Sequence, residues 1–178
     1  MKKLGFGLMR LPLLDPNDEQ SIDIETVKKM ADAFLGAGFT YFDTAACYHN
    51  GQSEIAFREA VSRRYPRNAY TITDKLTMFM LEKEDDMPSF FAGQLERLGV
   101  DYMDYYWLHG LEPNSYPKAE SFHAFEFVKQ LKEEGKVRHI GFSFHGDAKL
   151  LEEILTRHPE MEYVQLQLNY LDWEDEHV

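Results

Sequence analysis

The sequence predicts an α/β fold built from repeated strand-and-helix units, and three features support this prediction. Short β-rich runs alternate with amphipathic helical stretches along all 178 residues. The runs recur about every 30 residues, the length needed for a strand, a crossover helix and the next parallel strand. No G-x-G-x-x-G motif follows the first run, so the signature of an open dinucleotide-binding sheet is missing. We therefore predict a TIM-type (β/α)8 barrel, as a single domain over residues 1–178.

Six runs have the length and composition of buried parallel strands, because they are short and rich in β-branched, aromatic and aliphatic residues. We expect strands over residues 4–9, 39–42, 70–73, 103–108, 137–142 and 163–168. Only a short segment follows the sixth run. The sequence therefore predicts a barrel truncated after strand six, and thus an incomplete one. Its first and last strands would be open edges, through which self-association is an expected outcome.

The first two helices are predicted from apolar spacing and end signals. Asp23 is a suitable N-cap for the first helix, and Gly36 or Gly38 would end it. A second helix is expected from about residue 53 to residue 64. Apolar positions of the first helix at i, i+3, i+4 and i+7 form one stripe, which we expect to be buried: Val27, Met30, Ala31 and Phe34.

Three further helices follow the same rules. The third starts near Pro88 and ends before Gly99, and the fourth is predicted as one helix over about residues 119–134. Asp147 would cap the fifth helix, which Pro159 closes. The predicted buried residues are Phe91, Leu95 and Leu98 in the third helix and Leu150, Leu151, Ile154 and Leu155 in the fifth.

Composition excludes several classes of partner. The chain has 19 Lys and Arg against 31 Asp and Glu, a formal net charge of −12, which disfavours nucleic acid and anionic membrane surfaces. No stretch approaches the length of apolar sequence that spans a membrane, and the N-terminal apolar run is too short for a secretory signal. The single cysteine, Cys47, has no internal disulfide partner. These features predict a cytoplasmic protein.

Four polar residues are predicted at or just beyond the C-terminal ends of three successive strands: Asp43 and Tyr48, then Lys75, then His109. That edge holds the active site in barrel enzymes. A phenol is a weak acid at neutral pH, but a neighbouring ammonium lowers its pKa. Lys75 would supply this charge to Tyr48 and Asp43 would keep the lysine protonated, while His109 would hydrogen-bond a carbonyl oxygen that Tyr48 protonates. The set is suited to carbonyl reduction.

Two other chemistries use the same residues. Lys75 could act as a Schiff-base nucleophile in an aldolase-like enzyme. Asp43, His109 and His145 could approach a metal, but no H-x-H or H-E-x-x-H spacing supports this, and a lysine beside Asp43 opposes a cation. We therefore predict no metal site.

Three segments resemble the aldo-keto reductase family: residues 42–48 (FDTAACY), 73–75 (TDK) and 106–109 (YWLH). The similarity extends to residues 5–12 (GFGLMRLP), 51–54 (GQSE) and 135–143 (GKVRHIGFS). It implies an NAD(P)H-dependent reduction of a small aldehyde or ketone substrate, with Tyr48 as the acid. NADPH is the expected cofactor, and NADH stays open. The alternatives are a nicotinamide-binding regulatory protein without turnover and an inactive fragment.

The resemblance also implies which residues hold the nicotinamide carboxamide. Ser143 and a glutamine of the sixth strand would do so, with Gln167 as first choice and Gln165 as second. Many family members have asparagine after this serine, whereas Phe144 and His145 follow here, so His145 could replace that contact. This variant resembles the branch that often carries an iron-sulfur extension, although the cysteines of such an extension are absent.

Overall fold

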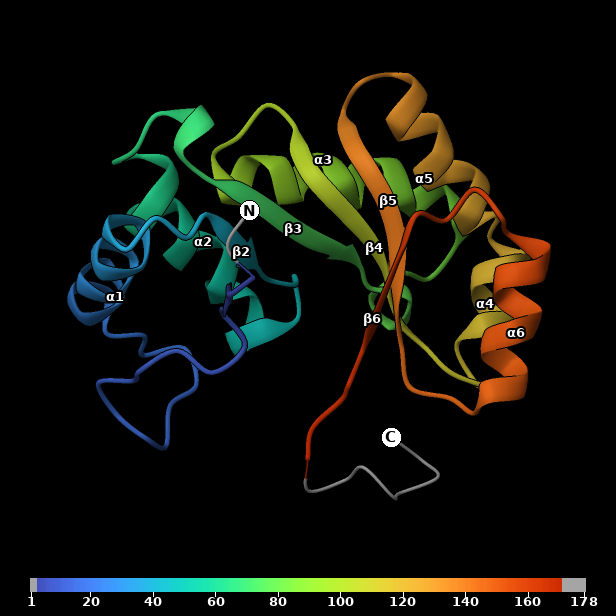
Figure 1. Ribbon diagram of the computed structural model, residues 1–178, viewed down its shortest axis with the longest axis horizontal. Helices are drawn as coiled ribbons and strands as arrows, with labels where there is room; N and C mark the ends of the chain where they lie inside the picture. The colour runs from blue at the N-terminus through green and yellow to red at the C-terminus, as the bar shows by residue number, and fades with distance from the viewer. Residues whose placement is uncertain (1–2, 171–178) are drawn as a thin grey trace.

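The computed structural model of the chain describes residues 3–170. Its strands form one parallel sheet in which neighbours along the chain are neighbours in space, from the first strand to the sixth. The strands are β1 (Gly5–Gly7), β2 (Tyr41–Asp43), β3 (Thr71–Leu76), β4 (Met103–Leu111), β5 (Val137–Phe144) and β6 (Tyr163–Leu166). The sheet curls and does not close, so β1 and β6 are its edges (Figure 1).

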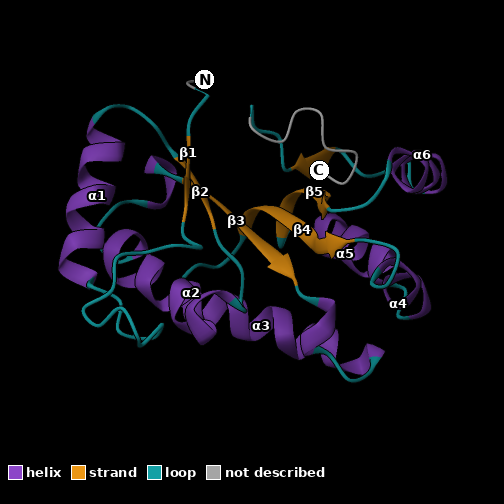
Figure 2. Ribbon diagram, turned by 90° about the horizontal axis from the view of Figure 1, so that it is seen from below, coloured by secondary structure: helices purple, strands orange, loops and turns teal. Residues whose placement is uncertain are grey.

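Helices cover the outer, convex side of this sheet, as the view in Figure 2 shows. This arrangement is that of a (β/α)8 barrel up to its sixth strand, as predicted from the alternation of strands and helices. The helices are α1 (Ile24–Gly36), α2 (Gln52–Phe57), α3 (Met87–Leu98), α4 (Tyr116–Ser121), α5 (Ala124–Glu133) and α6 (Ala148–Arg157). A π-helical turn, Arg58–Ser62, extends α2.

The first helix begins at the predicted cap. The Asp23 carboxylate accepts the backbone N–H of Thr26 at 3.0 Å, which satisfies one of the free donors of the first turn. Val27, Ala31 and Phe34 are buried as predicted. Met30 is 41% exposed, so its inclusion in the buried stripe was wrong. The 100° spacing of successive helical residues puts Met30 at the flank of the stripe formed by the other three.

The predicted helix over residues 119–134 is in fact two helices, α4 and α5. The chain turns at His123, whose φ of 51° lies in the left-handed region and cannot continue a right-handed helix. The His123 ring lies 3.0 Å from the Glu84 carboxylate at the protein surface. The sequence did not reveal this break, because the apolar residues keep a helical spacing on both sides of it.

The fifth predicted helix, α6, is capped by Asp147 as expected, with its carboxylate accepting the Leu150 N–H at 2.8 Å. Of the four residues predicted to be buried there, Ile154 is, Leu150 and Leu151 are half-buried, and Leu155 is 41% exposed. The prediction for Leu155 was therefore wrong. In α3, Phe91 and Leu98 are buried and Leu95 is half-buried.

One close backbone approach joins the last two strands. A Cβ on Gly141 of β5 would lie 2.3 Å from the carbonyl oxygen of Tyr163 in β6 and 2.7 Å from the Trp107 ring. Glycine therefore lets β6 pair closely with β5, which sets Gln165 beside Ser143 in the register of the sheet.

Candidate active site

The four residues predicted to carry the chemistry meet inside the curve of the sheet. Asp43 is the last residue of β2, and Tyr48 begins a short 3-10 turn, Tyr48–Gly51, that follows it. Lys75 and His109 lie within β3 and β4 rather than after them, because both strands run further than the sequence indicated. The parallel register brings all four side chains to one cavity of about 280 Å³.

The ammonium of Lys75 is the centre of this group. Its Nζ donates hydrogen bonds to Asp43 Oδ1 at 2.6 Å, to the Thr44 carbonyl at 2.8 Å and to the Tyr48 hydroxyl at 3.2 Å. These three acceptors use all three N–H groups of the ammonium. Lys75 is only 1% exposed, so an unpaired charge here would be costly. Since Lys75 donates to the phenol oxygen, the Tyr48 proton is free for another acceptor.

The pKa shifts differ in part from those expected. Burial raises the pKa of Tyr48 above its ordinary value, and the opposing effects of the Lys75 charge and hydrogen bond only partly offset this. Lys75 thus lowers the pKa of Tyr48 as expected, but burial has the larger effect and the net shift is upward. Burial would lower the pKa of Lys75, but Asp43 and Tyr48 outweigh it and the net shift is upward. Lys75 is thus a stable ammonium, as expected.

His109 lines the same cavity as Lys75. Its ring meets that of Tyr48 edge to face, with 5.8 Å between centroids. Burial, with smaller contributions from the Lys75 and His145 charges, lowers the pKa of His109 to about 3. The imidazole is therefore neutral at physiological pH, which allows it to donate one hydrogen bond and accept another.

The residues predicted to hold a carboxamide line the same cavity. Ser143 Oγ accepts the Gly110 N–H at 2.7 Å, so its own proton is free to be donated. Gln165 lies in β6 opposite Ser143 and donates to Asp43 Oδ2 at 3.3 Å, whereas Gln167 lies beyond the strand and is exposed. His145 follows β5 at the rim of the cavity. Both glutamines line the cavity, so the choice between Gln167 and Gln165 stays a prediction.

A larger cavity of about 670 Å³ adjoins the first. Tyr48 and His109 line both cavities, and so does Met9. The other walls of the larger cavity are mainly apolar side chains from the loop after β1 and from the segment after β3, among them Leu11, Leu13, Pro16 and Phe79. A ligand bound there would face both the phenol and the imidazole.

Sequence reasoning missed two residues that position this site. His49 follows Tyr48 in a left-handed conformation with φ of 51°. Its Nε2 accepts the Leu11 N–H at 3.0 Å and its Nδ1 faces the Glu19 carbonyl at 2.9 Å, which joins the cavity wall to the tyrosine turn. No sequence signal marked this contact. Thr77 was also missed, although its spacing of two from Lys75 was a signal for a shared strand face.

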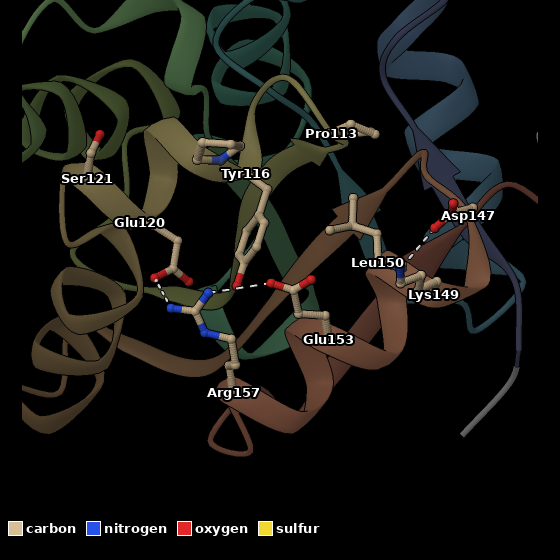
Figure 3. Close-up of a pocket in the computed structure, with 10 residues that line it drawn as sticks. Pro113, Tyr116, Glu120, Ser121, Asp147, Lys149, Leu150, Glu153 and Arg157 are labelled. Atoms are coloured by element: carbon tan, nitrogen blue, oxygen red, sulfur yellow. Dashed lines mark hydrogen bonds and ion pairs between the residues drawn. The ribbon is translucent and has the colours of Figure 1, made fainter.

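A further concave surface, between α4 and α6, contains none of the predicted residues. It has a volume of about 760 Å³ and is crossed by ion pairs of Arg157 with Glu120 at 3.0 Å and Glu153 at 3.5 Å (Figure 3). Within residues 3–170, no cluster of three or more His, Cys, Asp or Glu side chains is suited to a metal ion. In the same range, no helix has the length and apolar character needed to cross a lipid bilayer.

Comparison with known proteins identifies the family. The model of the Aldo/keto reductase family matches residues 3–178. The chain belongs to the aldo/keto reductase family. A probable aldo-keto reductase 1 of Glycine max is 34% identical over 153 residues, covering 80% of this chain and 41% of that protein. An NADH-specific methylglyoxal reductase of Escherichia coli is 29% identical over 194 residues, covering 97% of this chain and 56% of that protein.

Solved structures of aldo-keto reductases agree with this assignment. The holo form of an aldo-keto reductase from Bacillus halodurans superimposes with a TM-score of 0.72 at 27% identity, covering 93% of this chain and 53% of that one. The chain spans about half the length of the curated aldo-keto reductases it matches. The family and the curled sheet predicted from the sequence are thus confirmed.

Proposed function

We propose that the parent protein of this chain reduces an aldehyde or ketone to an alcohol with a reduced nicotinamide cofactor. The observation that carries the proposal is that Tyr48 and His109 stand between two adjoining cavities, one lined by Ser143 and Gln165 and the other mainly apolar. A carbonyl in the larger cavity would meet a phenol O–H and a neutral imidazole. These are the two hydrogen-bond donors that a developing alkoxide requires.

The smaller cavity fits a nicotinamide carboxamide. Ser143 has a free hydroxyl proton for the amide oxygen, and the Gln165 side chain carries both an acceptor and donors. When bound there, the cofactor would supply a hydride to the carbonyl carbon. NADPH is the cofactor we propose first, and the name of the Escherichia coli relative keeps NADH as a second choice.

Each residue of the quartet then has one task. Tyr48 donates its proton to the carbonyl oxygen, since Lys75 donates to the phenol oxygen and leaves that proton available. Lys75 stabilises the phenolate that is left, which compensates for the raised pKa of the free phenol. Asp43 holds the ammonium in place, and His109 orients the carbonyl.

The test combines cofactor binding with turnover. We would titrate the 178-residue chain with NADPH and with NADH by fluorescence, and follow oxidation of the cofactor with methylglyoxal as the probe substrate. Size-exclusion chromatography would report whether the open edges β1 and β6 associate. Tyr48→Phe should reduce turnover by roughly 100-fold or more and leave cofactor affinity nearly unchanged.

Tyr41→Phe is the matched control, since it removes a phenol hydroxyl that accepts from Thr73 and lines neither cavity. It should keep the wild-type rate. Binding without turnover in the wild-type chain would instead support the regulatory alternative. A rate unaffected by Tyr48→Phe would exclude this residue as the acid.

A further inference from the structure

The hydroxyl of Thr77 lies directly behind the catalytic imidazole. Thr77 is completely buried just after β3, and its Oγ1 is 3.0 Å from His109 Nδ1. It occupies the N-cap position of the 3-10 turn Met78–Met80, where threonine usually caps with its side chain. Here the side chain makes no capping bond. The Thr77 hydroxyl therefore forms its hydrogen bond with a buried side chain and not with the backbone of the turn.

The distances give the direction of this hydrogen bond. Besides the sulfur of Cys47, a weak acceptor, the Thr77 hydroxyl has two acceptors within reach, His109 Nδ1 at 3.0 Å and the Lys75 carbonyl at 3.5 Å. The longer distance lies outside the usual range for an O–H···O bond. The Lys75 carbonyl already accepts the Gln94 amide at 3.0 Å. The Thr77 proton therefore goes to the imidazole nitrogen.

A second neighbour of His109 Nδ1 leads to the same conclusion. Cys47 Sγ lies 3.9 Å from this nitrogen. Burial raises the pKa of the Cys47 thiol, so it keeps its proton at neutral pH. An N–H at Nδ1 could donate to the Thr77 oxygen, but the Thr77 and Cys47 protons would then lose this nitrogen as an acceptor, whereas a lone pair there accepts from both. The neutral imidazole then carries its proton on Nε2.

We propose that Thr77 is a positioning residue that fixes His109 as the Nε2–H tautomer, the form able to donate a hydrogen bond to a substrate carbonyl. The effect of this tautomer on catalysis rests on the proposed function, whereas the assignment of the tautomer itself does not. Without the Thr77 hydroxyl, the proton of His109 would distribute between its two nitrogens, and a fraction of molecules would present a lone pair to the carbonyl oxygen. A lone pair on Nε2 would repel the substrate carbonyl oxygen, to which His109 has to donate a hydrogen bond.

The test compares Thr77→Val, which keeps the shape and removes the hydroxyl, with Thr77→Ser, which restores a donor. The first readout is the ¹⁵N NMR spectrum of the His109 ring at neutral pH, which distinguishes the two tautomers and needs no activity. Thr73→Val is the matched control, since Thr73 is equally buried and loses a 2.8 Å hydrogen bond to Tyr41. We expect Nε2–H in the wild type, Thr77→Ser and Thr73→Val, and a mixture in Thr77→Val.

The second readout is kinetic. Thr77→Val should lower kcat roughly two- to threefold with cofactor affinity unchanged, because only the Nε2–H fraction of the mixture donates to the carbonyl, and Thr77→Ser should recover most of the rate. A wild-type proton on Nδ1, or a Thr77→Val spectrum identical to that of the wild type, would overturn the proposal. If the wild-type chain reduces no carbonyl, the proposed function fails while the tautomer assignment is still decided by the spectrum.

Discussion

Gln165 donates a hydrogen bond to Asp43 at 3.3 Å, although 122 positions separate the two residues in the sequence. The contact spans the inside of the curled sheet, from β6 back to the end of β2. It ties the strand that would hold the carboxamide to the carboxylate that holds Lys75. The cofactor side and the proton-donating side of the candidate site therefore share one hydrogen-bond network.

Because of this network, we predict that Gln165 contributes more to cofactor binding than Gln167. Gln165→Leu should weaken NADPH binding roughly tenfold, since one amide with its hydrogen bonds is lost from the cavity. The matched variant Gln167→Leu changes an exposed side chain beyond the strand and should alter the affinity less than about twofold. Fluorescence titration of both variants measures the difference. A larger effect at Gln167 would restore it as the first choice.

His109 should make the protein sensitive to acid. Its pKa is about 3 in the folded chain and near 6.5 when unfolded, so only the unfolded chain gains this proton between those values. The free energy of unfolding should fall as the pH drops below 6.5, by at most about 1.4 kcal/mol per pH unit from this group. His109→Gln should flatten the curve when urea unfolding is compared from pH 7 to pH 5. A parallel slope in the variant would contradict the buried neutral imidazole.

The same low pKa has a kinetic consequence. No inflection due to His109 should appear in the rate of carbonyl reduction between pH 5 and pH 8, because the imidazole stays neutral throughout. The pH profile of kcat measures this directly. A step near pH 6.5 that His109→Gln removes would show that the residue titrates in the working enzyme.

Asp74 should destabilise the fold at neutral pH. Its Oδ1 accepts the Lys75 N–H at 2.8 Å, but Oδ2 is buried without a hydrogen-bond partner. Burial, together with the nearby Glu54 carboxylate, raises the pKa of Asp74 well above 3.8. The folded chain therefore holds a proton that the unfolded chain has lost, and stability falls as the pH rises from about 3.8 to the folded pKa.

Asp74→Asn removes this penalty and should raise the free energy of unfolding at pH 7 by about 1 to 2 kcal/mol, with little effect near pH 4. Asp104→Asn is the matched control. Asp104 is also buried, but it pairs with Arg67 at 2.6 Å and Arg138 at 3.1 Å, so its loss should destabilise. Urea unfolding at both pH values distinguishes the two aspartates. If Asp74→Asn instead destabilised the protein at pH 7, this would show that the folded state requires the ionised carboxylate of Asp74.

Gly141→Ala should separate β6 from β5. The added Cβ would meet the Tyr163 carbonyl at 2.3 Å, and the cost should be about 1 to 3 kcal/mol of unfolding free energy. Gly7→Ala, also in a strand, meets nothing within 4 Å and should change stability little. Thermal unfolding compares the variants, and cofactor titration should show weaker binding for Gly141→Ala because Gln165 moves with β6. Equal stability of the two variants would contradict the close approach.

Strong local signals explain the parts of the fold that were predicted. The strand-and-helix alternation, the caps at Asp23 and Asp147 and the glycine stop at Gly99 depend on neighbouring residues, and all appear in the structure. Met30 and Leu155 were misplaced because a helical stripe gives a direction but not the width of the surface that covers it. The break at His123 was missed because one residue with positive φ leaves the apolar period on both sides intact.

The sequence by itself determined the family, the parallel order of the strands and the identity of the polar residues at their ends, because each depends on motifs or on a repeat along the chain. Only the tertiary structure decided how those residues act on one another. The acidity of Tyr48 depends on two opposing effects: burial raises its pKa and the charge of Lys75 lowers it. In this structure the effect of burial is the larger. The proton position on His109 depends on the Thr77 hydroxyl, 32 positions away. Both properties depend on distances between residues of different strands and on how far these residues are removed from water. A local sequence pattern does not contain this information.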